Sequence, residues 1–240
     1  MNTSSVDGTA FANELNNLFI RFDEQDFSSA RTNLSDHVRN SIKEEDSIEL
    51  QHVSLSDVEK SLRNVKCNKA AGPDKICGKF LKTCYKELSV AFHSLFQWSL
   101  DIQAVPRLWK SSVVVSIPKI PKPIAMSDYR PIALTAIPMK CFEKIIKGML
   151  LSQTKAIIDP CQFAYRERRG VEDAVITLLH KIYVHLEDAA TYARFLFLDF
   201  SSAFNTIQAH VLMEKLQQLE VNPVLNLWIM TFLTGRPHRV

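Results

Sequence analysis

An uninterrupted apolar run that ends in an aspartate constrains the fold of this chain more than any other feature. Residues 195–198 read Phe-Leu-Phe-Leu, and Asp199 follows them directly. An apolar run of this length without polar alternation predicts a central β-strand that is buried on both faces. A carboxylate at the end of such a strand is a suitable divalent-metal ligand, because the strand holds it rigidly beside an open loop. Asp199 could instead cap the next helix or pair with a cation, and the run alone leaves these alternatives open.

Apolar residues at helical spacing elsewhere predict a helix-rich α+β fold with a short antiparallel sheet. The predicted helices cover residues 11–22, 56–65, 80–99, 139–150, 171–186, 211–219 and 223–233. The helix at 56–65 is expected to open with a Ser-Asp-Val-Glu capping box, and the last helix with Asn222 as N-cap and Pro223 at its first position. Strands are predicted at 48–53 and 113–117, the second leading into a hairpin at 119–126. The helices at 139–150 and 171–186 are both expected to face the core.

Charge is strongly segregated along the chain, although the formal net charge is only +3. Residues 1–59 carry 4 Lys/Arg and 12 Asp/Glu, whereas residues 60–170 carry 20 Lys/Arg and 7 Asp/Glu, a net charge of +13. A basic middle third is the pattern of a surface that follows a phosphate backbone. A solvated lysine-rich surface would give the same count, so charge alone leaves both interpretations open.

Cysteine usage and hydropathy indicate the setting in which the chain works. Its five cysteines are odd in number and form no Cys-x-x-Cys pair, which argues against a disulfide framework and a zinc knuckle. This pattern predicts a reducing, intracellular location, without deciding between nucleus and cytoplasm. No apolar run approaches the roughly 20 residues that span a bilayer, so no membrane partner is expected.

Residues 197–207, which read Phe-Leu-Asp-Phe-Ser-Ser-Ala-Phe-Asn-Thr-Ile, resemble the first catalytic block of reverse transcriptases from non-LTR (LINE-type) retrotransposons. The resemblance implies that Asp199 is a ligand of the Mg²⁺ pair that drives nucleotidyl transfer. It also implies that Phe200 contributes a backbone carbonyl to the metals. Phe204 would lie under the sugar of the incoming nucleotide and favour deoxynucleotides, with ordinary core packing as the alternative.

Four further segments resemble blocks of the same family and occur in the family's order. They are Lys-Ala-Ala-Gly-Pro-Asp-Lys-Ile at 69–76, Ile-Pro-Lys at 117–119 with Asp-Tyr-Arg-Pro-Ile-Ala-Leu at 128–134, Gln-Phe-Ala-Tyr-Arg at 162–166, and Phe-Leu-Thr-Gly-Arg-Pro at 232–237. The chain departs from the family pattern at Ala71, Lys75 and Ala164, where the family has proline, glycine and glycine. Blocks in order are a more specific signal than any one motif.

The resemblance assigns a role to the basic residues of these blocks. Lys119 and Arg130 would bind the triphosphate of the incoming nucleotide, with Arg130 able to hold two phosphate oxygens. An exposed loop lysine is the alternative for Lys119. The residues expected to contact the RNA template or DNA primer are Lys69, Gln162, Tyr165, Arg166 and Arg169, with Arg168 beside them. Tyr165 would stack on a base, and Arg166 could instead form an internal salt bridge.

The same resemblance implies a division of the chain and a function. Residues 1–55 would be an N-terminal helix and acidic interdomain linker, 56–190 a fingers-like region, and 191–240 a partial palm that stops before the Asp-Asp catalytic hairpin. The chain contains no Asp-Asp pair, so we predict that it has no polymerase activity alone. The expected function is a fragment of an RNA-directed DNA polymerase that uses RNA template, DNA primer and deoxynucleoside triphosphates. A catalytically dead nucleic-acid-binding remnant and an unrelated cytosolic α/β enzyme are the alternatives.

Overall fold

The computed structural model describes residues 8–20, 32, 35–36, 51–188, 191–200 and 207–239. The chain divides into two compact units, which are described separately below. Unit 1 comprises residues 1–153 and 205–240, and unit 2 comprises residues 154–204. The acidic segment between residues 23 and 46 falls almost entirely outside the described residues. The boundaries predicted after residues 55 and 190 remain predictions.

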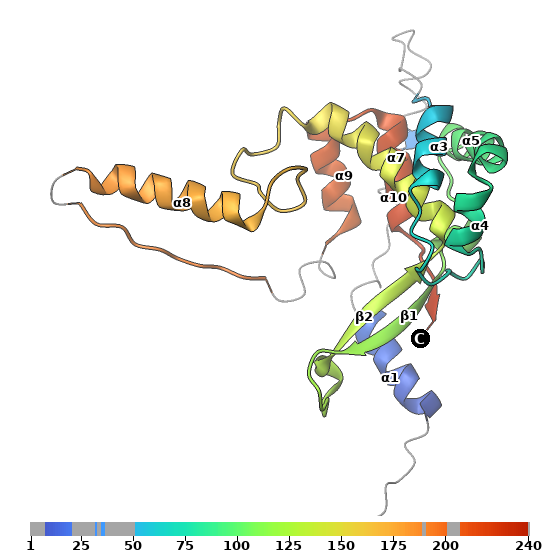
Figure 1. Cartoon of the computed structure of the whole chain (residues 1–240), viewed down its shortest axis with the longest axis horizontal. Coiled ribbons are helices and arrows are strands. Elements are labelled where there is room, and N and C mark those ends of the chain that lie inside the picture. Colours follow the sequence, from blue (N-terminus) through green and yellow to red (C-terminus); the bar gives the residue numbers. More distant parts are fainter. Residues whose placement is uncertain are drawn as a thin grey trace, which may run out of the picture. The chain divides into compact units, whose positions relative to one another are not determined.

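Helices are the main secondary structure of the described residues, and one small sheet lies in unit 1 (Figure 1). The elements of unit 1 are α1 (Gly8–Ile20), α3 (Leu55–Arg63), α4 (Gly78–Thr83), α5 (Tyr85–Asp101), α6 (Arg107–Lys110), β1 (Ser112–Pro118), η1 (Met126–Asp128), β2 (Tyr129–Thr135), α7 (Ile137–Thr154), α9 (Ala209–Gln218), α10 (Pro223–Leu233) and β3 (His238–Arg239). Unit 2 contains α8 (Val171–Leu186). The predicted helix-rich chain with a short antiparallel sheet is therefore confirmed.

The sheet has the strand order β2-β1-β3. β1 and β2 form the predicted antiparallel hairpin, in register from Ser112 opposite Thr135 to Pro118 opposite Tyr129. β3 pairs in parallel with the start of β1, where Ser112 lies opposite His238. No local pattern predicted β3, because a two-residue strand is defined only by the distant strand that it pairs with. α1 lies beside the hairpin, with the Phe11 ring edge-on to Tyr129 at 5.8 Å between centroids (Figure 1).

Aromatic side chains from α5, α7 and α10 form the centre of the unit 1 core. The Phe96 and Phe142 rings are parallel with centroids 4.3 Å apart, and the Trp228 ring meets Phe142 edge-on at 4.9 Å. The indole Nε1–H of Trp228 donates to Ser99 Oγ at 3.0 Å, which satisfies its one polar group. α10 begins as predicted, since the Asn222 side chain accepts from Val224 N and Pro223 occupies the first position.

Three local predictions in unit 1 need correction. α3 begins one residue before the predicted capping box, with Ser54 at the N-cap and no side-chain capping bond. The helix expected over 80–99 is broken at Cys84 into α4 and α5. Residues 51–53 are not a strand. Their backbone is held by side chains instead, as Val53 N donates to Gln97 Oε1 and Val53 O is hydrogen-bonded to His93.

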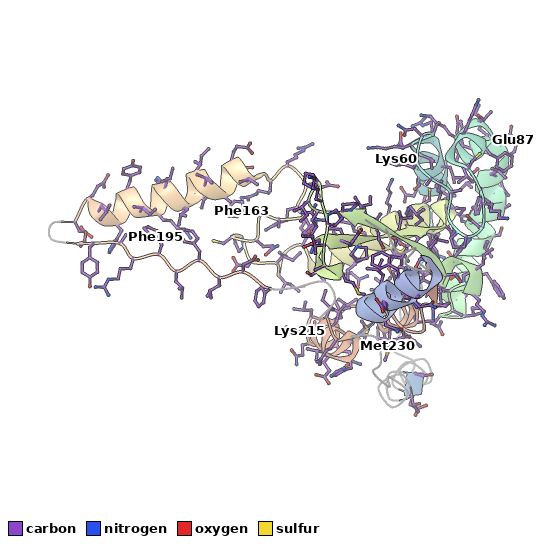
Figure 2. All side chains as sticks on the ribbon, turned by 90° about the horizontal axis from the view of Figure 1, so that it is seen from below. Lys60, Glu87, Phe163, Phe195, Lys215 and Met230 are labelled. Atoms are coloured by element: carbon purple, nitrogen blue, oxygen red, sulfur yellow. The ribbon has the colours of Figure 1, made fainter. Side chains whose placement is uncertain are left out.

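Two packing predictions in unit 2 are wrong. α8 has the predicted bounds, but none of its residues is buried. Residues 191–200 are extended without strand pairing, and Leu196, Phe197 and Leu198 are 82%, 83% and 79% exposed. A buried central strand requires partner strands at both edges and covering layers on both faces. Among the described residues of unit 2, this segment runs alongside α8 only (Figures 1 and 2).

Candidate functional site

The β1–β2 hairpin places the two predicted triphosphate ligands near its loop. Lys119 follows β1, and its backbone N–H donates to Asp128 O at 2.7 Å across the hairpin. Arg130 is exposed on β2, two residues beyond Asp128 and opposite Ile117. Lys119 therefore lies two positions along the chain from Ile117, the residue opposite Arg130.

Lys119 also organises the hairpin loop. Its Nζ donates to Ser127 O at 2.5 Å, so this lysine closes the loop that it borders. The Asp128 carboxylate accepts from Ile124 N at 3.0 Å and Ala125 N at 2.9 Å. The hydrogen bonds from Ala125 and Ile124, and then the charge of Lys119, hold the pKa of Asp128 below its ordinary value. To bind a phosphate, Lys119 would have to break its hydrogen bond to the Ser127 carbonyl.

The turn that contains Lys69 docks at the opposite end of β2. A Cβ atom at Gly72 would lie 2.4 Å from Ala136 N and 2.6 Å from Thr135 O, so the two backbones are in direct contact. Thr135 lies five residues beyond Arg130, which is about 17 Å at the strand rise of 3.3–3.4 Å. Lys69 itself is exposed on this turn. The structure therefore brings Lys119 and Arg130 together and places the Lys69 turn at a separate position on the same hairpin.

Two carboxylates lie partly buried near this second position. Burial raises the pKa of Asp74 above its ordinary value, against hydrogen bonds from the Ile76 and Asp74 amides and the charge of Lys140. Burial also raises the pKa of Glu143 above its ordinary value near 4.5, against the charges of Arg236 and Lys140. Arg236 lies over the Phe232 ring, 4.3 Å from its centroid. This group of charges was not predicted, because its members come from three distant segments.

Glu143→Gln is expected to stabilise the protein at neutral pH and to flatten its stability profile. A raised carboxyl pKa means that the folded state binds more protons than the unfolded state. Stability is therefore fully present below the unfolded value near 4.5 and falls as pH rises through the higher folded value. Denaturant unfolding measured from pH 4 to pH 8 checks this, with the exposed Glu87→Gln as control. If the stability of Glu143→Gln still fell with rising pH as steeply as that of the wild type, this expectation would be contradicted.

In unit 2 the predicted nucleic-acid residues lie on one loop, residues 159–170, which precedes α8. Arg166 Nη1 donates to Asp159 O at 3.0 Å, and the Gln162 side chain donates to Ala164 O at 3.2 Å. The Arg169 guanidinium lies over the Phe163 ring, 5.4 Å from its centroid. The Tyr165 side chain is 79% exposed. Gln162, Arg166 and Arg169 thus make contacts that contribute to the structure of the loop itself.

Asp159 anchors this loop and was missed in the sequence. Its carbonyl accepts from Gln162 N at 2.9 Å as well as from Arg166, and its carboxylate accepts from Cys161 N at 2.7 Å. The sequence did contain a signal for this turn, because Asp159 is followed by Pro160 and an Asp-Pro pair favours the start of a turn.

Asp199 is exposed at the end of the extended segment, and its Oδ1 accepts from Phe200 N at 2.9 Å. Within the described ranges no three His, Cys, Asp or Glu side chains gather in a way that could hold a metal ion. One exposed carboxylate does not meet the ligand demand of a two-ion site. Phe204 lies outside the described residues. The described chain therefore supplies a single candidate ligand rather than a metal centre.

None of the helices in the described ranges is long and apolar enough to cross a membrane. All five cysteines are free thiols, and only Cys141 is buried.

Known proteins that resemble this chain are named as polymerases or other proteins of mobile elements. Residues 117–240 match the family described as reverse transcriptase (RNA-dependent DNA polymerase). The chain is 28% identical to the RNA-directed DNA polymerase from mobile element jockey of Drosophila melanogaster, over 81% of this chain and 21% of the relative. From the same species, it is 29% identical to the probable RNA-directed DNA polymerase from transposon X-element, over 70% of this chain and 19% of the relative. It is 26% identical to the putative 115 kDa protein in type-1 retrotransposable element R1DM, over 77% of this chain and 18% of the relative. The chain spans about a fifth of the length of these curated relatives.

Proposed function

This chain belongs to the reverse transcriptase (RNA-dependent DNA polymerase) family, and from that premise we propose that it is part of a retrotransposon enzyme that copies RNA into DNA. The observation that carries the proposal is the family match over residues 117–240, slightly more than half of the chain. Relatives named as polymerases of mobile elements support it. Since the chain spans about a fifth of these relatives, the activity belongs to the longer parent.

Within that parent we assign residues 56–190 to the fingers and residues 191–240 to part of the palm of a right-hand polymerase. Residues 1–55 would connect them to a preceding domain. The basic hairpin supports the fingers assignment, because a two-stranded lid that carries cations can close over a nucleotide. The free thiols are compatible with work inside the cell, in a reducing compartment.

Each part of the chain then has a chemical task. Arg130 grips two phosphate oxygens of the deoxynucleoside triphosphate, and Lys119 adds a second cation. Contacts to template and primer are assigned to Lys69 in unit 1 and to Gln162, Tyr165, Arg166 and Arg169 in unit 2. Phe204 limits the space beside the sugar of the incoming nucleotide. These tasks orient the nucleotide and the strand before any bond is made or broken.

Divalent metal ions supply charge neutralisation and activation of the primer hydroxyl in this family. Mg²⁺ is the ion we propose. Asp199 would be its first carboxylate ligand, with the Phe200 carbonyl beside it, and further carboxylates must come from a second block that this chain does not contain. The chain alone is therefore expected to extend no primer. Mg²⁺-dependent extension by the purified chain, lost in Asp199→Ala, would contradict this expectation.

A catalytically dead, nucleic-acid-binding remnant is the less favoured candidate function. The relatives are named as polymerases, which favours the fragment of an active enzyme. Both candidates require that the chain binds nucleic acid, so that binding is the property to test first.

The chain is expected to bind single-stranded RNA or DNA with an affinity that falls steeply with salt. For about five phosphate contacts, the affinity should drop about 100-fold between about 50 and 200 mM salt, because bound counterions are released. Fluorescence anisotropy with a labelled oligonucleotide measures it. Lys69→Glu should weaken binding, whereas Lys86→Glu, exposed on α5, serves as the control. An affinity that does not depend on salt would contradict the proposed function.

A further inference from the structure

The β1–β2 hairpin is anchored at its base, at the end far from its loop. β3 pairs with the start of β1, and the turn that contains Gly72 contacts the backbone of Thr135 at the end of β2. β1 extends over Ser112–Pro118, which is about 20 Å at the strand rise of 3.3–3.4 Å. Both anchors therefore lie a full strand length away from Lys119 and Arg130, at the loop end of the hairpin.

α1 meets the hairpin at this loop end. The Phe11 ring lies edge-on to Tyr129, with 5.8 Å between centroids. Tyr129 is the first residue of β2 and pairs with Pro118, the last residue of β1. It thus precedes Arg130 in the chain and lies opposite the residue that precedes Lys119. A helix that holds Tyr129 in place therefore holds the strand positions from which both cations extend.

α1 has one buried side and one exposed side. Phe11 and Leu15 are four residues apart, so they share a face of the helix. Leu15 is only 2% exposed, whereas Asn13, Glu14 and Asn17 are exposed. The buried side is the one that contacts the hairpin, and the polar residues face solvent (Figure 1).

β1 also has one buried and one open side. Val114 is 7% exposed, whereas its neighbours Val113 and Val115 are 38% and 41% exposed. By the pairing register, Val114 shares a face with Tyr129, because paired residues point the same way and faces alternate along a strand. Arg130 follows Tyr129, so its side chain extends from the open face and is exposed. α1 thus supports the hairpin from behind and leaves Arg130 accessible.

We propose that α1 is a brace for the nucleotide-binding hairpin, in which Phe11 and Leu15 are positioning residues that hold Arg130 ready for the triphosphate. A preorganised site loses less conformational entropy when its ligand binds. Without the brace, a smaller fraction of molecules would hold Arg130 in the binding geometry, and the apparent affinity would fall by that fraction. The inference rests on the proposed function and gives α1 a role beyond that of a connection between domains.

The affinity of the full chain for dye-labelled dATP, measured by fluorescence anisotropy, tests the brace. Phe11→Ala and Leu15→Ala should each weaken binding about threefold, as expected if about one third of the molecules keep the binding geometry. Phe11→Tyr keeps the ring and should bind as the wild type does. Asn13→Ala, at an exposed position of the same helix, is the matched control and should change little.

A double-mutant cycle with Arg130→Gln separates positioning from a general loss of structure. Arg130→Gln alone should weaken binding about tenfold, because a hydrogen bond between charged groups is lost. If Phe11 acts through Arg130, then Phe11→Ala should weaken binding no further in the Arg130→Gln background. A merely structural role would lower the affinity by the same factor in both backgrounds.

The outcomes separate this inference from the proposed function. If Arg130→Gln weakens binding but Phe11→Ala binds as the wild type does, the brace is wrong and the proposed nucleotide-binding role stands. An equal loss from Phe11→Ala in both backgrounds would also overturn the brace. If the wild type does not bind the nucleotide, or Arg130→Gln binds it equally well, the role proposed for the hairpin fails and the brace fails with it.

Discussion

Phe142→Ala is expected to lower the free energy of unfolding of unit 1 by about 3–5 kcal/mol. Phe142 is fully buried, stacked on Phe96 with centroids 4.3 Å apart and edge-on to Trp228 at 4.9 Å. Its removal deletes contacts with α5 and α10 at once and leaves a cavity that rigid helices cannot fill. Urea unfolding followed by tryptophan fluorescence measures the change, since Trp228 reports on this site directly.

Phe80→Ala is the matched control for that substitution. Phe80 lies on α4 and is 50% exposed, so the same change in side chain removes much less buried area. A loss of about 1 kcal/mol is expected from its partial burial. The aromatic cluster would not be the centre of the unit 1 core if both variants lost equal stability.

Gly72→Ala is expected to destabilise unit 1 by about 2–3 kcal/mol, although it adds a single methyl group. The added Cβ would meet Ala136 N at 2.4 Å and Thr135 O at 2.6 Å. Both atoms belong to the backbone at the start of α7 and the end of β2, so neither can move aside as a flexible side chain would. The turn at 69–76 must separate from the hairpin, which displaces Lys69 as well.

Gly148→Ala, in the same unit, is expected to change stability in the opposite direction. Gly148 lies inside α7, and a Cβ atom there would meet nothing within 4 Å. Alanine should therefore stabilise the helix by about 0.5–1 kcal/mol, because it restricts the unfolded chain. Thermal and urea unfolding of the two variants should move in opposite directions. A stable Gly72→Ala protein would show that the turn is not docked on the hairpin.

Predictions from the sequence were most accurate where the determining interactions are local. Asn222 and Pro223 begin α10 as expected, because a cap and a proline act within one helical turn. β1 and the hairpin that follows it were predicted from one β-branched run that ends at a proline, whereas β2 was not predicted as a strand. The bounds of α8 follow from its own apolar spacing. Its expected burial was wrong, since spacing identifies a face but not what covers it.

The candidate site likewise combines features that local sequence predicts with contacts that only the tertiary structure reveals. The sequence suggested Lys119 and Arg130 as nucleotide ligands, which stays a prediction, and the structure places Arg130 opposite Ile117, two residues before Lys119. It could not indicate that Lys119 donates to Ser127 or that Arg166 and Arg169 are used inside their loop. Those contacts depend on how each turn closes in space.

The apolar run before Asp199 was determined by the sequence alone, as were the family to which its motif points and the helices that surround it. Whether that run becomes a buried strand was decided by tertiary structure, because strand formation needs hydrogen-bond partners from other segments. In the described part of the chain residues 195–198 have none, and they remain extended and exposed. Local chemistry specifies which structure a segment can form, and only its neighbours in space decide whether it does.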